Sequence, residues 1–412
     1  MKRATPVLLL VAAVAWWMLS VRPAWRAVTS VRHGRDYATY YYAVIEAVAP
    51  ERPGRGDPYD TAALGRRARA EGTRRSVHPY FYPPPFLLSM LWVTPPGRAP
   101  LSLATGYRAW FWMNQGMLLA VLWALHRWFR AHPLVLAGLA LSLSALPDNA
   151  RMGQANLLVL WLSVVGLWRG SGVALGAAAM AKMSPALYLV AWVAERRWKP
   201  VLAAIGTAVA LSLLALPLVP LQTQIRFYTE ILPGFSSGNY HGLTVPITLP
   251  ANHSIPDLFN QLWPGPDDHT LSDRARIASQ AVSLSLLGVL AWGAATRRRA
   301  MAADPLVAAN LYGALSVLML ITPVYTYEHH LVVMLLPLAA LAQAFVERRL
   351  SRRWLLLALP AGFLVCWPLR WLRSAQELWP AASWVLQESR FFGLVWVGGL
   401  CFTAAMVRKN SK

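Results

Sequence analysis

Apolar runs of nearly twenty residues recur along most of this 412-residue chain, separated by short turns or charged clusters. An α-helix needs about 20 mainly apolar residues to cross a bilayer, so the pattern predicts an all-α polytopic membrane protein. Residues 1–412 are expected to form a single integral membrane domain. The runs at 83–97, 133–147 and 155–168 are short, which indicates tilted, broken or partly re-entrant helices. About twelve transmembrane helices can be delimited: 6–24, 83–97, 105–126, 133–147, 155–168, 173–194, 201–220, 277–296, 305–325, 330–346, 354–372 and 391–407.

Two long polar stretches, residues 25–82 and 221–276, interrupt the apolar pattern. A cytoplasmic N-terminus would place both on the outer face of the membrane. The first is rich in Arg and Tyr, and its segment "GRRARAEGTRR", residues 65–75, is typical of short amphipathic helices that lie on a membrane surface. We therefore predict two long outer-face loops.

The charge distribution supports this orientation. Hydrophobic residues make up 56% of the chain and charged residues 14%, yet the net charge is +21. Lys and Arg accumulate on the cytoplasmic side of membrane proteins, so we predict cytoplasmic termini and anionic membrane lipids, not nucleic acid, as the partners of this charge. Arg127 and Arg130 fall on the outer side in this arrangement. The other basic clusters lie at Lys2–Arg3, Arg196–Lys199, Arg297–Arg299, Arg348–Arg353 and Arg408–Lys412.

Other protein classes leave recognisable motifs that this sequence lacks. Its two cysteines, Cys366 and Cys401, lie inside apolar runs and indicate neither a disulfide framework nor a zinc site. There is no GxxxxGK[ST] motif, no strand-framed GxGxxG and no evident internal repeat. The sequence therefore gives no sign of nucleotide binding or of the inverted repeats of many transporters.

Asp36 is the first candidate for chemistry. It lies in "VRHGRDYATYYYA", about a dozen residues after the first apolar run, and so near the outer membrane surface. It could be a loop acid paired with Arg32 or Arg35, because exposed ion pairs are common. Taken alone, its neighbours favour this interpretation over a catalytic carboxylate.

Lys182 is the second candidate, within "AAAMAKMSPALYL" and one turn before Pro185. A charge deep in an apolar span costs at least ~2.5–3.5 kcal/mol, so such a residue usually faces a partner or a watery cavity. Lys182 lies near the middle of its run, where snorkelling to the membrane surface is difficult. An anionic ligand such as a phosphate would explain its position.

Two further motifs surround the membrane interface. The stretch "HPYFYPPPF", residues 78–86, contains Tyr82 and fits either a rigid helix start with an aromatic belt or the lining of a cavity. The stretch "RMGQANLLVL", residues 151–160, contains Gln154 and Asn156, which are typical of polar contacts between packed membrane helices.

The last polar motifs lie in and after the second loop. Asn252 and His253 begin an "NHS" triplet, which also fits a glycosylation acceptor. Glu328, His329 and His330 lie at the outer end of an apolar run, in "ITPVYTYEHHLVVMLLP". Adjacent histidines on a helix point in different directions, so we do not expect both to bind one metal ion.

The order of these motifs resembles glycosyltransferase family 87, the polyprenyl-phosphate-mannose-dependent mannosyltransferases of the GT-C superfamily. The similar stretches are "GRDY…YY.A", "DPYD", "YPPPF", "GQANLLVL", "AKMSPALYL", "NHS" and "P…Y.YEHHLVVMLLP", from about residue 34 to 338. The family usually has "KltP" where this chain has Lys182 to Pro185, and "sPisW.hH" where it has Thr322 to His330.

This resemblance implies a GT-C fold whose first outer loop carries the catalytic carboxylate, at Asp36. It implies a sugar donor linked through phosphate to a polyprenol, and a glycolipid or glycan acceptor on the periplasmic or exterior face of the cell (inner) membrane. The predicted donor-phosphate or substrate-binding residues are Arg35, Tyr82, Gln154, Asn156, Lys182, Asn252, His253, Glu328, His329 and His330.

The chemistry of the residues agrees with this prediction. A polyprenyl phosphate leaves as an anion and needs positive charge, from Lys182, nearby arginines or a histidine. The acceptor hydroxyl needs a base, the role predicted for Asp36. A single carboxylate favours direct displacement with inversion, since a retaining mechanism uses two. No DxD motif is evident, so we expect neither a metal ion nor another cofactor.

Two alternatives remain open at this stage. A GT-C transferase could use another lipid-linked sugar, such as arabinofuranose. A secondary transporter would also use an intramembrane lysine and a broken span. Against the transporter are the missing repeat and the long outer loop with Asp36. The oligomeric state is not determined by the sequence.

Overall fold

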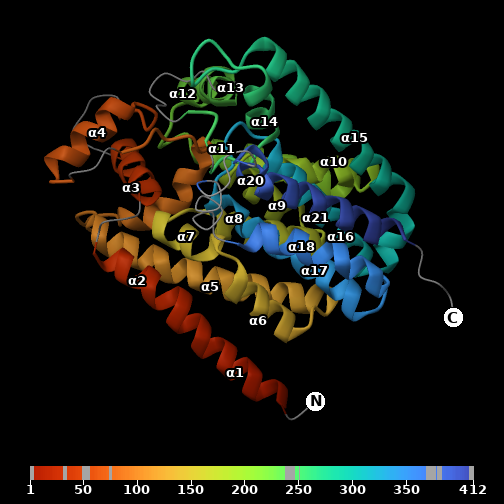
Figure 1. Ribbon diagram of the computed structural model, residues 1–412. Helices are drawn as coiled ribbons and strands as arrows, with labels where there is room; N and C mark the ends of the chain where they lie inside the picture. The colour runs from red at the N-terminus through yellow and green to blue at the C-terminus, as the bar shows by residue number, and fades with distance from the viewer. Residues whose placement is uncertain are drawn as a thin grey trace.

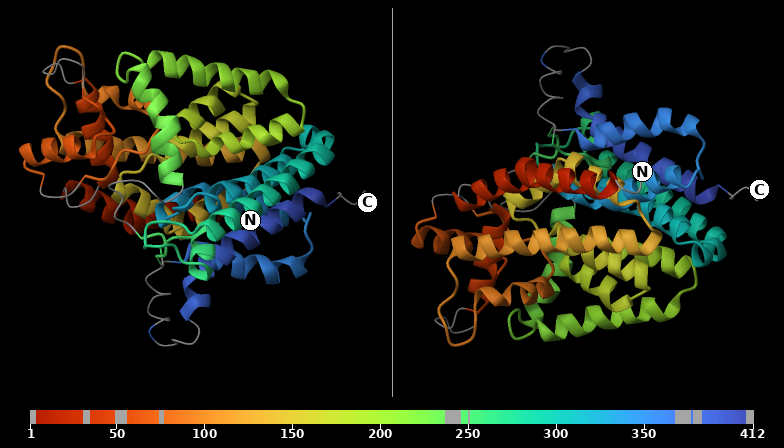
Figure 2. Two further views of the ribbon diagram at one scale, coloured as in Figure 1. Left: turned by 90° about the horizontal axis from the view of Figure 1, so that it is seen from above. Right: turned by 90° about the horizontal axis from the view of Figure 1, so that it is seen from below.

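The computed structural model describes residues 4–30, 35–48, 56–73, 77–236, 246–249, 251–367, 377 and 383–407. Within these ranges the regular secondary structure is helical and no strand occurs, which confirms the predicted all-α class. Long helices form a bundle, with α3, α4 and α12 to α14 gathered at one end of it (Figures 1 and 2). The chain begins at the other end of the bundle.

The first predicted span is one continuous helix from Thr5 to Thr29. It consists of α1 (Ala4–Trp16), the π-helical turn η1 (Trp17–Val21) and α2 (Arg22–Thr29). Along it, Leu10 and Leu19 are 66% and 72% exposed. Apolar side chains this exposed on a helix of spanning length are those that lipid would cover.

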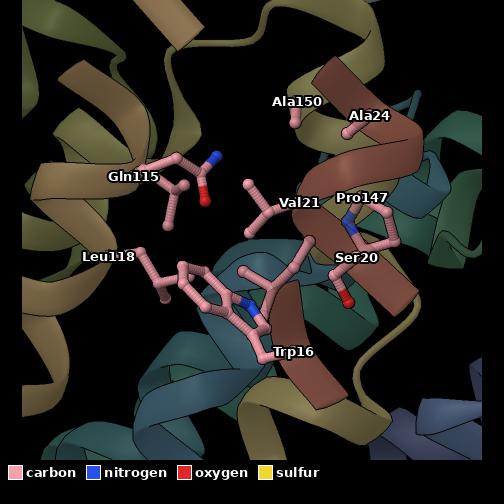
Figure 3. Close-up of a pocket in the computed structure, with 10 residues that line it drawn as sticks. Trp16, Ser20, Val21, Ala24, Gln115, Leu118, Pro147 and Ala150 are labelled. Carbon is pink, nitrogen blue, oxygen red and sulfur yellow. The ribbon is translucent and has the colours of Figure 1, made fainter. Parts of the chain in front are cut away.

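A small cavity separates this first helix from the helices behind it (Figure 3). Trp16, Ser20, Val21, Gln115 and Pro147 line a space of about 10 Å³. A cavity of that size holds about one water molecule. It is therefore a packing feature and not a substrate site.

The first predicted loop folds into helices anchored by tyrosines. The helix α3 (Arg35–Val48) is part of a core and not a free loop. Its tyrosines are at most 3% exposed, namely Tyr37, Tyr40, Tyr41 and Tyr42. Of the predicted amphipathic segment 65–75, residues 65–70 belong to a helix that starts at Thr61 and buries Ala63, Leu64 and Ala68, and residues 74 and 75 lie outside the described part of the chain. Its place on a membrane surface stays a prediction. The helices of this region are α3 (Arg35–Val48), α4 (Thr61–Ala70) and the 3₁₀ helix η2 (Pro84–Val93).

The predicted span 83–97 does not cross the bundle. Its consecutive prolines wind it into η2, a 3₁₀ helix that is too short to span a bilayer. The N–H of Leu101 donates to Val93 O at 2.9 Å, and Tyr41 donates to Leu101 O at 2.8 Å. Both ends of η2 therefore lie beside the first-loop helices.

The central part of the chain contains a broken helix and a hairpin. The predicted short span at 133–147 is a pair of helices bent by 60°, which confirms that this run is broken. The helices are α5 (Leu103–Phe129), α6 (Pro133–Ser142), α7 (Ala145–Met152), α8 (Asn156–Arg169), α9 (Gly172–Ala181), η3 (Ser184–Ala186), α10 (Leu187–Ala194) and α11 (Trp198–Leu214).

The predicted span 173–194 also turns back instead of crossing. An ideal Cβ on Gly172 would lie 2.1 Å from Pro200 O, and one on Gly176 would lie 2.5 Å from Ala204 O. The start of α9 is thus level with the start of α11, although α10 lies between them in sequence. The α9–α10 hairpin has its tip at Lys182, and only glycine permits this close approach to the α11 backbone.

The two non-crossing segments change the predicted side of Arg127 and Arg130. The helix α5 starts against α3, because an ideal Cβ on Gly106 would lie 2.2 Å from the Tyr37 hydroxyl. Just beyond its other end, the N–H of His132 donates to Gln343 Oε1 at 3.0 Å. Gln343 precedes the basic cluster Arg348–Arg353, so Arg127 and Arg130 lie at the same end as that cluster. The prediction that they lie at the opposite end from the other basic clusters was therefore wrong. Which face of the membrane this end occupies stays a prediction.

The second predicted loop packs against the first. Its helices are α12 (Leu221–Arg226), η4 (Phe227–Ile231), α13 (Leu232–Ser236) and α14 (Ile255–Leu262). Phe81 and Phe235 have ring centroids 4.4 Å apart, and an ion pair joins Arg226 to Asp57. The two loops therefore form one assembly at one end of the bundle, shown in orange and green in Figure 1.

The C-terminal half surrounds one fully buried helix. Every residue of α16 from Leu306 to Ile321 is buried, and α15, α17 and α21 pack around it. The helices here are α15 (Asp273–Ala303), α16 (Pro305–Ile321), η5 (Glu328–Met334), α17 (Leu335–Val346), η6 (Arg352–Trp354), α18 (Leu355–Cys366), α20 (Ser383–Gln387) and α21 (Ser389–Met406).

The predicted number of crossings is not confirmed. Among the described residues, four helices are long and apolar enough to cross a membrane, or five if the bent pair counts as one span. The other apolar helices are shorter, with 10 to 17 residues. Because η2 and the α9–α10 hairpin both turn back, the predicted number of crossings falls by two and remains even. An even number keeps both termini on one side of the membrane, and their cytoplasmic location stays a prediction.

Candidate functional site

A cavity of about 1000 Å³ lies where the two loops meet the membrane helices. Segments far apart in sequence form its walls: α3, residues 78–83 before η2, the α7–α8 junction, the tip of the α9–α10 hairpin and residues 319–333. The residues predicted for the site that line it are Asp36, Tyr82, Gln154, Asn156, Lys182, Glu328, His329 and His330.

Asp36 lies in the first turn of α3, half-buried at the cavity wall. Gln154 Nε2 donates a hydrogen bond to its Oδ2 at 2.7 Å. The neighbouring Tyr37 fixes the helix, because its ring stacks on Tyr107 with centroids 5.4 Å apart. An ideal Cβ on Gly153 would lie 2.6 Å from Tyr37 Cβ, and Gly153 has a positive φ of 70°. The glycine before Gln154 therefore allows the two segments to meet.

Gln154 connects the groups of the site. Its Oε1 accepts from the hydroxyls of Tyr40 at 3.0 Å and Tyr82 at 2.8 Å, so its Nε2 must face Asp36, whose carboxylate only accepts. The same Nε2 lies 3.2 Å from His329 Nε2. An amide donor requires an unprotonated ring nitrogen there, which places the His329 proton on Nδ1.

Burial keeps the two tyrosines protonated. Desolvation raises the pKa of the Tyr40 and Tyr82 hydroxyls well above the ordinary value, and the nearby Asp36 charge raises them further. Their hydroxyl oxygens are 2.6 Å apart. Both hydroxyls therefore stay neutral. Tyr82 donates to the amide oxygen of Gln154, and the single proton of Tyr40 is shared between that oxygen and the Tyr82 hydroxyl.

Lys182 lies at the tip of the α9–α10 hairpin, where the helical backbone is interrupted. Its Nζ donates to Asn156 Oδ1 at 2.8 Å, and Asn156 Nδ2 donates to His329 O at 2.9 Å. No carboxylate among the described residues lies within ion-pair distance of this ammonium group. An ammonium group placed in this way is suited to an anionic ligand.

His329 and His330 diverge, as predicted for neighbours on a helix. Their ring centroids are 4.4 Å apart and the ring planes differ by 77°. His330 Nδ1 accepts from the N–H of Tyr327 at 3.1 Å and so caps the start of η5. His329 is the one that reaches Gln154, and both line the cavity.

Glu328 is 14% exposed and held from behind. Its Oε1 lies 3.2 Å from His253 Nε2, and its Oε2 forms an ion pair with Arg390. Burial first, and then the Arg390 charge, lower the pKa of His253 to about 3. His253 is therefore neutral at physiological pH, and Arg390 supplies the positive charge that balances Glu328.

Two predicted residues, Asn252 and His253, are not among those that line the cavity, and a third, Arg35, has a side chain outside the described part of the chain. Asn252 and His253 are buried behind its wall. The Asn252 amide donates to Val324 O at 2.8 Å and accepts from the N–H of Thr326 at 2.8 Å, which fixes that wall segment. Arg35 opens α3, but its side chain lies outside the described residues. Their contact with substrate stays a prediction.

Sequence reasoning missed a second buried polar cluster. Arg390 is fully buried in the first turn of α21, although in sequence it looks like a charge flanking the last apolar run. Asp257 and Glu388, both 0% exposed, are bridged by Gln261, whose Nε2 lies 3.4 Å from Asp257 Oδ1 and 2.7 Å from Glu388 Oε1. These residues lie some 130 positions apart in sequence, so no local pattern links them. The ion pair of Asp148 and Arg151 at the cavity wall was also missed.

The described residues hold no group of three His, Cys, Asp or Glu side chains that could bind a metal ion. Metal independence of the chemistry stays a prediction.

Comparison with known families identifies the family of the chain. The model of glycosyltransferase family 87 matches residues 80–323, which is more than half of the chain. The chain belongs to glycosyltransferase family 87. The GT-C superfamily placement agrees with this family, and membership makes the chain a membrane glycosyltransferase.

The matched part of this GT87 protein contains Tyr82, Gln154, Asn156 and Lys182. Asp36 and His329 lie outside it, one on each side in sequence, and Gln154 contacts both. No curated protein matches the chain, and no solved structure matches it either.

Proposed function

We propose that this GT87 enzyme transfers a sugar, mannose, from a polyprenyl-phosphate donor to a hydroxyl of a glycolipid or glycan at the outer face of the cell membrane. One observation supports the proposal most strongly. The carboxylate of Asp36 and the ammonium group of Lys182 line the same cavity. One chain of hydrogen bonds connects them, from Asp36 through Gln154, His329 and Asn156 to Lys182.

The reaction needs a base on one side of the sugar carbon. Asp36 accepts the proton of the acceptor hydroxyl as that oxygen bonds to C1 of the sugar. Gln154 holds one carboxylate oxygen at 2.7 Å and so orients the base. A single base with direct displacement gives inversion at C1, because no enzyme-bound sugar intermediate forms.

The leaving group needs positive charge on the other side. The bond between C1 and the phosphate oxygen breaks, and the polyprenyl phosphate leaves with the electron pair as an anion. Lys182 contacts that anion from the hairpin tip, while Asn156 holds its Nζ at 2.8 Å. His329, neutral with its proton on Nδ1, adds a hydrogen-bond donor beside it.

The lipid part of the donor needs an apolar surface next to the phosphate site. Met183 and Leu187 follow Lys182 on the hairpin and line the same cavity. Other apolar side chains continue the wall, namely Leu232, Phe235, Met319, Leu320 and Val333. A polyprenol can therefore lie against the hairpin while its phosphate meets Lys182.

The test is a transfer assay with purified enzyme and a set of radiolabelled polyprenyl-phosphate sugars, including mannose and arabinofuranose. We expect transfer from the mannose donor, with the anomeric configuration inverted in the product. Transfer from the arabinofuranose donor alone would change the sugar assignment. Uptake into proteoliposomes without any transfer to acceptor would contradict the proposed function.

A further inference from the structure

Glu328 and Asp36 are two carboxylates that line one cavity. Both oxygens of Glu328 are engaged by buried groups, one by the ring of His253 and one by the guanidinium of Arg390. A carboxylate whose charge is balanced by a buried arginine is a weak base. It remains a good acceptor of hydrogen bonds from neutral hydroxyl groups.

The support behind Glu328 is built from buried groups. Arg390 and His253 are both 0% exposed, and Arg390 also donates to Ser144 Oγ at 3.1 Å. Arg390 belongs to α21, Ser144 precedes α7, and His253 precedes α14. Arg390 and His253 thus hold the carboxylate directly, and Ser144 holds Arg390, while the Glu328 side chain keeps 14% exposure and lines the cavity.

Glu328 is also close in sequence to the reacting groups. The next residue, His329, contacts Gln154 through its ring and Asn156 through its carbonyl oxygen. A group bound by Glu328 is therefore beside the chain that joins the base to Lys182. In a glycosyl transfer this neighbourhood holds the sugar that moves, whose hydroxyls are neutral donors.

We infer that Glu328 binds a hydroxyl of the transferred sugar and that Arg390, from the last membrane helix, is the positioning residue that holds Glu328 ionised for this contact. The inference rests on the proposed function and adds to it a sugar-recognition residue and its support. It assigns Glu328 to sugar specificity and not to proton transfer.

The charged and titratable groups around Glu328 set its pH behaviour. They are His253, which stays neutral, Arg390, and the neighbouring rings of His329 and His330. Asp257 and Glu388 lie further off on α14 and at the start of α21. Removing the Arg390 charge leaves Glu328 without a balancing cation. The pKa of the Glu328 carboxyl group should then rise into the working pH range.

The first experiment pairs Glu328→Gln with monodeoxy analogues of the polyprenyl-phosphate sugar, and measures kcat/KM for each. In the wild type, we expect removal of the contacted hydroxyl to lower kcat/KM by about tenfold or more, since hydrogen bonds to charged groups are strong. In Glu328→Gln, the same analogue should lower kcat/KM much less, relative to the natural donor. An equal loss for every analogue in both proteins would overturn the inference, provided the wild type transfers the natural sugar. Absence of wild-type transfer would instead contradict the proposed function.

The second experiment tests the role of Arg390 by its pH profile. Arg390→Met should gain an acidic limb, with kcat/KM rising as pH increases, because Glu328 must ionise to bind the sugar. Arg390→Lys should restore most of the wild-type profile. A profile unchanged in Arg390→Met would overturn the positioning role.

Arg390→Met leaves a buried carboxylate without its partner, which can destabilise the fold. The double variant Arg390→Met/Glu328→Gln removes both charges and serves as the folded reference. It should show no acidic limb and should lose discrimination among the deoxy analogues. Discrimination retained in this double variant would contradict the inference independently of the single variants.

Discussion

At the scale of single residues, chemically similar groups in the site differ in their polar neighbours. Asp36 accepts a hydrogen bond from the amide of Gln154, and Glu328 is charge-balanced by Arg390. The proposed roles are the base for Asp36 and sugar binding for Glu328. The two histidines diverge in the same way, one toward Gln154 and one toward its own backbone. Residue type alone would not distinguish these roles.

Lys182→Ala should weaken donor binding by at least about tenfold, because a charged hydrogen bond to the donor phosphate is lost. Acceptor KM should change far less. The measurement is the Kd of the polyprenyl-phosphate donor in detergent, with Lys199→Ala at the start of α11 as the control. Unchanged donor affinity in a folded Lys182→Ala protein would rule out the phosphate contact.

Asp257 gives the fold a predicted pH dependence. Burial first, and then the Glu388 charge, raise the pKa of Asp257 from 3.8 to about 8. A raised pKa means that the folded protein binds the extra proton, so this contribution to stability is complete below about pH 4 and is lost as the pH rises through 8. The melting temperature of the wild type should therefore fall between pH 6 and pH 9.

Asp257→Asn should reduce this fall in melting temperature, since the side chain no longer titrates. Asp273→Asn, whose parent residue is 83% exposed, is the matched control and should retain the wild-type dependence. A pH dependence identical in wild type and Asp257→Asn would show that Asp257 does not carry the proton.

At the scale of elements, the α9–α10 hairpin shows where sequence reasoning reaches its limit. The apolar run 173–194 has the length of one crossing, and that length predicted a span. The break at Lys182 and Pro185 was visible, but whether the chain continues or returns depends on α9 packing along α11. That packing brings together residues about 28 positions apart in sequence. The hydrophobic pattern within one helix does not predict such a contact.

Gly176→Ala should lower the stability of the hairpin, because the added methyl group would lie 2.5 Å from the backbone oxygen of Ala204. Such overpacking typically costs about 1–3 kcal/mol. Gly206→Ala on α11 is the matched control, since nothing lies within 4 Å of an added Cβ there. We expect a lower melting temperature and weaker donor binding for Gly176→Ala alone. Equal melting temperatures for the two variants would contradict the packing described for α9.

The same comparison applies to the rest of the site. The order of motifs in the sequence predicted that Asp36, Gln154, Lys182 and His329 belong together, and the structure places them on one cavity. The local pattern around Gln154 favoured packing between helices. It could not show the two tyrosine partners, because they lie 114 and 72 residues away in sequence. Arg390 could not be predicted, since it meets Glu328 only once the last helix is in place.

At the scale of the whole molecule, the two predicted outer loops form one cap over the cavity. The ion pair of Asp57 with Arg226 and the contact of Phe81 with Phe235 connect them. Lys182 at the tip of the α9–α10 hairpin and Asp36 on α3 both line this cavity. Under the proposed function, a lipid-bound donor phosphate and an acceptor hydroxyl would meet in this cavity, as glycosyl transfer requires.

The most direct test of this account is single-turnover transfer by Asp36→Asn with the polyprenyl-phosphate sugar already bound. We predict donor Kd within about twofold of the wild type and a transfer rate lowered by at least about 100-fold, because only the base is lost. Asp273→Asn should transfer at the wild-type rate. Wild-type transfer by Asp36→Asn would contradict the assignment of Asp36 as the base and, with it, the proposed mechanism.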